Sequence, residues 1–319
     1  MNLLPSKLFY VPNKDTYPPF KNGFYLEEYV FNYMRNNNII YDNKGRLYLP
    51  ILWTNFQIEG WFNSKKTEMQ TILDNYIISN ICNKGYFTVV QYDDGPLLKL
   101  PSNTIIYGAC SGTIPIPLIY QDITNKLDNK YLEWNTKWNA KWNATARTIL
   151  CSFVGTNTHP IRIEMQNKLS NRSNFMFSYT KGWTSNVDSN KQTNFIETTL
   201  QSKFALAPRG YGRSSFRFFE IIKLGAIPIY IWDDIEWLPY MDIENIDYTK
   251  FAISINISNI DKLENILLNI LATGQYITML KELENIKNNK IFDLDYLCNY
   301  ITNNNVNNTV NNAVNNAVI

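Results

Sequence analysis

Histidine is almost absent from this sequence, since His159 is the only one among 319 residues. A two-histidine zinc site is therefore excluded, and a histidine-based catalytic triad depends on that single residue. The four cysteines, Cys82, Cys110, Cys151 and Cys298, have no short spacing. This spacing excludes a zinc knuckle and argues against a disulfide framework. Their apolar neighbours are typical of buried free thiols in a reducing compartment.

Long apolar runs and an excess charge of one sign are missing as well. No stretch approaches the roughly 20 apolar residues that cross a bilayer, so no transmembrane segment is expected. The N-terminal residues contain early prolines and no compact apolar segment of signal-peptide type, and we expect a soluble, cytoplasmic protein. Thirty basic and 28 acidic residues leave a net charge of +2. A nucleic-acid partner is not expected, because phosphate neutralisation usually needs a basic excess.

What the chain does contain is apolar material for two ordinary domains. Hydrophobic residues make up 45% of it and charged residues 18%, a globular composition. The last stretch, residues 303–319, is a low-complexity run rich in asparagine, which predicts a disordered tail. Residues 1–145 and 146–302 are the two predicted domains.

The first predicted domain alternates buried strands with a helix. Apolar runs predict strands at 48–53, 87–92 and 105–109, and helical spacing predicts a helix at 67–81. The stretch 133–147 has a tryptophan every four residues and is interpreted as a linker with some helix. Strands that alternate with helices imply a parallel sheet covered on both faces.

The second predicted domain repeats this alternation more clearly. Strands are predicted at 148–154, 175–179, 204–207, 226–232 and 251–255, and helices at 161–169, 193–201, 214–224, 260–271 and 276–286. Two α/β halves in succession make a cleft between them the natural ligand site.

The most informative stretch runs from Phe204 to Asp234. A strand leads into a glycine-containing loop, and Ser214 or Ser215 then caps a helix. Glycines let the backbone approach a ligand, a helix N-terminus offers free N–H groups, and arginines bind phosphate oxygens. The pattern predicts a diphosphate site formed by Arg209, Gly210, Tyr211, Gly212, Arg213, Ser214 and Ser215.

Glu220 is the second feature of this stretch, because it lies on or beside the apolar side of the helix. A carboxylate there is costly unless it is paired or used. It has the reach to accept hydrogen bonds from the two hydroxyls of a ribose. The alternative is an intrahelical ion pair with Arg217 or Lys223. The neighbouring loop favours the ribose role.

This stretch resembles the signature of exostosin-type glycosyltransferases. That signature consists of a PRG-x-G loop, a serine, an arginine, an FE helix, a glycine and IP before the next strand. The matching residues here are Pro208, Arg209, Gly210, Gly212, Ser215, Arg217, Phe219, Glu220, Gly225, Ile227, Pro228 and Asp234. A second match is Phe153-Val154-Gly155 followed by Arg162. The resemblance is specific over about a hundred residues of the second half.

The resemblance implies a GT-B architecture, in which two Rossmann-like domains face each other across a cleft. The C-terminal domain would hold a nucleotide-sugar, UDP-linked, with Gly155 and Arg162 among the donor-binding residues. A glycan hydroxyl would be the acceptor of the hexosyl or pentosyl group, and the transfer would be inverting and metal-independent. Animal and plant relatives are usually membrane-anchored, so a bacterial or viral setting is expected for this chain.

Candidates for the catalytic base are few. Asp93 and Asp94 follow a predicted strand, at the end where open α/β sheets bind ligands, although an ordinary Asp-Gly turn also explains them. His159 lies in the loop between Gly155 and Pro160, within reach of phosphate or acceptor. Asp233-Asp234 and Asp293-Leu-Asp295 have the form of acidic metal motifs, but we interpret the first as a turn and expect no metal and no cofactor.

Two alternatives of other classes stay open. Gly210, Gly212 and Ser215 fall one residue short of the dinucleotide fingerprint, which leaves an NAD(P)-dependent oxidoreductase as a rival. The aromatic content of 14% also suits a carbohydrate-binding module that has kept the transferase fold without turnover.

Overall fold

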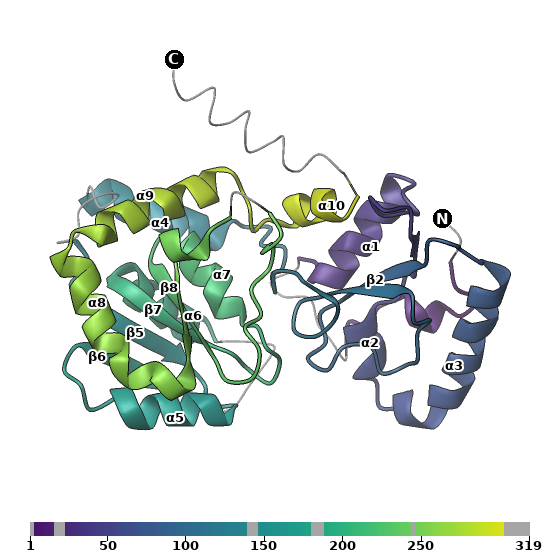
Figure 1. The fold of residues 1–319 in the computed structure, drawn as a ribbon, viewed down its shortest axis with the longest axis horizontal. Helices are drawn as coiled ribbons and strands as arrows, with labels where there is room; N and C mark the ends of the chain where they lie inside the picture. The colour runs from purple at the N-terminus through teal and green to yellow at the C-terminus, as the bar shows by residue number, and fades with distance from the viewer. Residues whose placement is uncertain (1–2, 16–22, 139–145, 180–187, 244–245, 303–319) are drawn as a thin grey trace, which may run out of the picture. The chain divides into compact units, whose positions relative to one another are not determined.

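The computed structural model describes residues 3–15, 23–138, 146–179, 188–243 and 246–302. The described chain divides into two compact units. Unit 1 takes in the residues up to Ile123, Leu238–Tyr240 and the residues from Asp293 onward, and unit 2 takes in Thr124–Trp237 and Met241–Phe292. Each unit has its own parallel sheet with helices around it (Figure 1). The predicted α/β class with two parallel-sheet units is confirmed.

Unit 1 is built on a four-stranded sheet in the order β1-β2-β3-β4, and all neighbouring pairs are parallel. Its strands are β1 (Leu47–Tyr48), β2 (Tyr86–Val90), β3 (Thr104–Gly108) and β4 (Ile114–Pro115). Its helices are η1 (Lys7–Phe9), α1 (Leu26–Asn36), α2 (Trp53–Gln57), α3 (Phe62–Ser79) and α10 (Leu294–Thr302).

The strand predicted at 48–53 is wrong beyond Tyr48, since the chain leaves the sheet there and α2 begins at Trp53. Pro50 lacks the N–H that a central strand must donate. The run is apolar because its side chains enter the core: Trp53 is fully buried, and its Nε1 donates to Thr88 Oγ1 at 2.8 Å. A buried turn and a buried strand look alike in a short apolar sequence.

Unit 2 is built on a five-stranded sheet in the order β6-β5-β7-β8-β9, again with every pair parallel. Its strands are β5 (Ile149–Gly155), β6 (Phe175–Tyr179), β7 (Ser202–Pro208), β8 (Ile227–Trp232) and β9 (Ile253–Asn256). Its helices are α4 (Lys126–Trp138), α5 (Pro160–Leu169), α6 (Ser189–Leu200), α7 (Phe216–Lys223), η4 (Tyr248–Lys250), η5 (Ile257–Lys262), α8 (Leu263–Ala272) and α9 (Gln275–Asn288). All five predicted strands are present, and β6 has the predicted bounds.

Residues 133–138 of the segment interpreted as a linker form the end of the helix α4, which packs against α6 and α7 and belongs to unit 2. Tyr131 on α4 donates to Glu284 Oε2 at 2.9 Å. The predicted domain boundary at residue 145 and the predicted tail at 303–319 lie outside the described residues.

The residues from Asp293 to Thr302, assigned to the second domain by sequence, return to unit 1. There α10 packs on α1, and Tyr29 donates to Asp295 Oδ1 at 2.6 Å. A terminal helix can pack on any unit that offers it an apolar surface, whatever its place in the chain. No helix among the described residues has the length and apolar character needed to cross a membrane.

Candidate functional site

The strand order of unit 2 reverses between β5 and β7, because the chain moves outward from β5 to β6 and then returns past β5 to β7. At such a switch point the loops after two adjacent strands turn to opposite faces and leave a crevice at their carboxyl ends, where open α/β sheets bind ligands. The loops that follow Gly155 and Pro208 start at this point. The sequence analysis had placed predicted donor-site residues in both of these loops.

The loop after β5 leads into α5 through His159, the residue that caps this helix. Its Nδ1 accepts from the amide of Ile161 at 3.4 Å. Burial and the nearby Arg209 guanidinium lower the pKa of His159 below its ordinary value. The ring is therefore neutral at pH 7, as the accepted bond requires. It meets the ring of Tyr211 edge-on at 6.4 Å, which brings the two loops together.

Arg209 is folded into the loop after β7 and is 8% exposed. Its Nη1 donates to the carboxylates of Asp233 at 2.7 Å and Asp234 at 2.6 Å. Its Nη2 donates to the Tyr211 carbonyl at 2.8 Å, and its Nε lies 3.3 Å from the Gly212 carbonyl. Every nitrogen of this guanidinium is used to shape the loop.

Arg162 on α5 braces the same loop from the other side. Its Nε donates to the Arg209 carbonyl at 2.9 Å, and its Nη2 donates to the Pro208 carbonyl at 3.2 Å. Its Nη1 donates to the Thr156 carbonyl at 3.0 Å, in the loop after β5. Burial, aided by the charge of Arg217, lowers its pKa to about 10. Arg162 therefore ties the two switch-point loops to each other.

Arg213 differs from these two arginines. Its Nε donates to Asp234 Oδ2 at 2.8 Å, and its guanidinium lies 5.6 Å from the centre of the Trp237 ring. Within the described residues Nη1 and Nη2 make no hydrogen bond, and the side chain is 27% exposed. Arg213 thus has donors available for a ligand at this edge of the sheet.

The pair Asp233-Asp234 is more than the turn expected from sequence, because both side chains receive the arginines of the loop. Although burial works in the opposite direction, hydrogen bonds from the Ile235 amide and from Arg213, with the charge of Arg209, lower the pKa of Asp234 to about 2. Sequence reasoning missed this role. The available signal was two acidic residues at the end of the strand next to an arginine-rich loop.

Ser215, and not Ser214, caps α7, since its Oγ accepts from the Arg217 amide at 3.3 Å. Glu220 Oε2 receives Arg217 Nη1 at 2.7 Å, so the intrahelical pair that sequence left open is present. The Arg217 guanidinium also lies 3.7 Å from the centre of the Phe195 ring. The ring contact holds the Arg217 guanidinium on one side of the Glu220 carboxylate.

Asp93 and Asp94 lie in an exposed turn after β2 in unit 1. The Gly95 amide donates to the Tyr92 carbonyl at 3.0 Å, and Gly95 has a φ of +77°. This is the geometry of the ordinary Asp-Gly turn considered from sequence.

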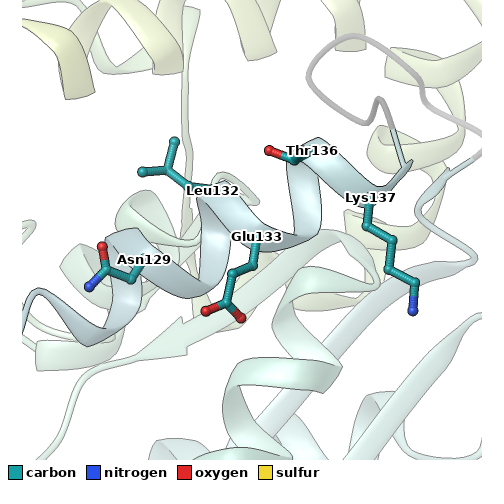
Figure 2. Close-up of a pocket in the computed structure, with 5 residues that line it drawn as sticks. All are labelled: Asn129, Leu132, Glu133, Thr136 and Lys137. Carbon is teal, nitrogen blue, oxygen red and sulfur yellow. The ribbon is translucent and has the colours of Figure 1, made fainter.

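Among the described residues, a separate hollow of about 610 Å³ in unit 2 is lined by side chains of α4 alone. Figure 2 shows its side chains along α4, with Leu132 and Thr136 on one side of the helix and Glu133 and Lys137 on another. None of the residues predicted for the donor site lines it.

The region that contains this switch point is similar to known proteins. Residues 121–270 match the family model of the Exostosin GT47 domain. A probable glycosyltransferase of Arabidopsis thaliana is 25% identical over 144 residues, which are 45% of this chain and 28% of that protein. The chain therefore spans well under a third of the relative it matches. Among solved structures, WaaG, a glycosyltransferase involved in lipopolysaccharide biosynthesis, aligns with 75% of this chain and 83% of its own at 11% identity and a TM-score of 0.38.

Proposed function

We propose that the chain is a glycosyltransferase that uses a nucleoside diphosphate sugar, a UDP-sugar, as donor, because residues 121–270 match the family model of the Exostosin GT47 domain. The acceptor is a glycan hydroxyl. The observation that carries this proposal is the arginine-braced switch point of unit 2, where Arg213 keeps two unbonded donors beside the N-terminus of α7. Anionic groups bind at such places because helix N-terminal amides and a guanidinium both donate to them.

The proposal gives the predicted donor residues different tasks. Arg213 binds the diphosphate together with the amides at the start of α7, whereas Arg209 and Arg162 hold the loop in shape. Glu220, which is paired with Arg217, is assigned to the ribose hydroxyls. Tyr211, which is 68% exposed, offers an aromatic face at the same edge.

Departure of the nucleoside diphosphate leaves negative charge on its terminal phosphate while the sugar gains oxocarbenium character. A preorganised guanidinium and helix amides stabilise that charge as it develops. The proposed transfer is a single, inverting displacement without a metal.

The test is the thermal shift of the full chain with UDP, GDP, CMP or NAD. UDP at about 100 times its dissociation constant should stabilise the protein by roughly 2.7 kcal/mol. Arg213→Ala should weaken UDP binding about 10- to 100-fold, the usual effect of losing a charge-assisted hydrogen bond, and Arg213→Lys should recover part of it. Glu220→Gln measures the ribose contact in the same assay.

Arg172 provides the matched control. It is also 27% exposed and paired with carboxylates, but it precedes β6 at the opposite edge of the sheet. Arg172→Ala should leave UDP binding unchanged. Undiminished UDP binding by Arg213→Ala would contradict the phosphate assignment, and stabilisation by NAD alone would favour the oxidoreductase.

A further inference from the structure

Asp233 is the first residue after β8, at the carboxyl edge of the sheet of unit 2. Its side chain is 35% exposed and lies beside the arginine loop of the donor site. One of its two carboxylate oxygens is bound to that loop, and the other is not. The second oxygen is a hydrogen-bond acceptor that the loop itself does not need.

The side chain and the backbone of Asp233 are both held in place. Its Oδ1 accepts from Arg209 Nη1 at 2.7 Å and from the Asp234 amide at 2.9 Å. Its carbonyl accepts from Asn256 Nδ2, at the end of β9, at 3.1 Å. These bonds orient the carboxylate before a ligand arrives, and such preorganisation lowers the cost of binding one.

The other oxygen, Asp233 Oδ2, makes no hydrogen bond with any residue that the structure describes. The neighbouring Asp234 differs, because its Oδ1 accepts from Arg209 and its Oδ2 accepts from Arg213. Asp233 is therefore the member of this pair that has an oxygen available. An ionised oxygen accepts stronger hydrogen bonds than a neutral one.

Asp233 borders both loops of the switch point. Its carboxylate is hydrogen-bonded to the loop after β7, through Arg209. It also acts on His159 in the loop after β5: burial and the charge of Arg209 lower the pKa of His159, and the charge of Asp233 works in the opposite direction. The free oxygen thus belongs to the crevice in which open α/β sheets bind ligands.

The chemistry of this oxygen limits what it can bind. It repels the diphosphate, since both are negatively charged, and it needs a hydrogen-bond donor. A UDP-sugar carries its donors as hydroxyls on its two sugars and as one N–H on its base. Glu220 is assigned to the ribose. Because the diphosphate bound by Arg213 joins the ribose to the transferred sugar, a second carboxylate beside this arginine is placed to bind the transferred sugar.

We propose that Asp233 is a specificity residue of the donor site, whose Oδ2 accepts a hydrogen bond from a hydroxyl of the transferred sugar. The transferred sugar is then a neutral one. A uronic acid is disfavoured, because its carboxylate adds a second negative charge close to Asp233. This inference rests on the proposed function and adds to it the chemical class of the sugar.

The first test uses the unmodified chain and measures dissociation constants by calorimetry. UDP-glucose is compared with UDP-glucuronate, and UDP-galactose with UDP-galacturonate. The members of each pair differ in one group, a neutral hydroxymethyl in the first and a carboxylate in the second. We expect the chain to bind the neutral member of at least one pair about 10-fold more tightly than the uronate.

Asp233→Asn is the second test, because the amide oxygen keeps an acceptor for Arg209 while an N–H₂ group replaces the free oxygen. The lost charge affects the diphosphate of every ligand alike, so each dissociation constant is divided by that of UDP. Relative to UDP, the neutral UDP-sugar should bind about 10-fold more weakly to Asp233→Asn, and its advantage over the uronate should disappear.

Asp261→Asn is the matched control. Asp261 is also a carboxylate paired with an arginine, but its partner is Arg172, at the opposite edge of the sheet. This variant should leave all the dissociation constants unchanged.

Three results would overturn the assignment of Asp233. They are equal binding of neutral sugars and uronates by the unmodified chain, a preference that survives in Asp233→Asn, and a loss in that variant that is as large for UDP as for the UDP-sugars. The last result would place Asp233 at the ribose or the base. Failure of the unmodified chain to bind UDP at all would instead refute the donor site, and the proposed function with it.

Discussion

At the scale of single residues, two carboxylates of this chain, Glu220 and Glu27, lie on or beside the apolar side of a helix. Glu220 was found from sequence because a carboxylate stood beside apolar helix positions. The same criterion applies to Glu27, which shares a helix side with Leu26, Val30 and Met34. Its partners Thr54 and Gln91 lie 27 and 64 residues away, and only the folded chain brings them to it.

The raised pKa of Glu27 predicts how stability depends on pH. Because of its burial, the carboxyl binds its proton more tightly in the folded chain, with a pKa of about 7, than in the unfolded chain, where it is close to 4.5. The stability that this tighter proton binding gives the folded chain is fully present below pH 4.5. It is lost as the pH rises through 7, by roughly 3 kcal/mol in all. The free energy of unfolding in urea should therefore fall between pH 5 and 8 for the unmodified chain relative to Glu27→Gln, which has no carboxyl group at this position. Parallel curves would show that Glu27 ionises as freely as in water.

At the scale of elements, the interior of unit 2 depends on a guanidinium that sequence reasoning did not single out. Arg147 is 3% exposed and precedes β5. Its Nη1 donates to the Thr199, Leu200 and Ser202 carbonyls, and its Nη2 donates to the Leu224 and Gly225 carbonyls. One side chain thus satisfies the carboxyl ends of both α6 and α7.

Arg147→Met should destabilise unit 2 by at least about 3 kcal/mol, because it leaves five buried carbonyls without their donor. The free energy of unfolding in urea, or the melting temperature, measures this loss. Arg172→Met, which removes an arginine paired at the surface, should cost less than about 1 kcal/mol. Equal losses in the two variants would mean that Arg147 is not the cap inferred from its contacts.

The sequence predicted the bounds of helices and strands best where buried residues recur at a regular spacing or form a continuous run. The strands of unit 2 are near-continuous apolar runs, and β7 and β8 are buried along almost their whole length. The prediction failed beyond Tyr48, where an apolar run packs as a turn and a short helix. It also missed α1 and α10, because neither segment was recognised as amphipathic.

At the scale of the whole molecule, the proposed activity makes one further prediction. If Arg213 and the amides of α7 stabilise the leaving diphosphate, UDP release from the UDP-sugar should be the same with and without EDTA. The measurement is the initial rate before and after chelation, with MgCl₂ and MnCl₂ added back as controls. Activity that disappears with EDTA and returns with either metal would place a cation in the reaction.

The sequence by itself determined the α/β class, the two parallel-sheet units and the glycine-arginine loop between β7 and α7, because burial patterns and helix caps are local properties of a chain. Tertiary structure alone decided that Arg209 turns inward to Asp233 and Asp234, that α10 returns to unit 1, and that Glu27 meets Thr54 and Gln91. These pairings join residues far apart in sequence, and no periodicity records them. They depend on which side chains the folded sheets bring close together. Burying a charge costs the least free energy where the fold already holds a hydrogen-bonding partner beside it.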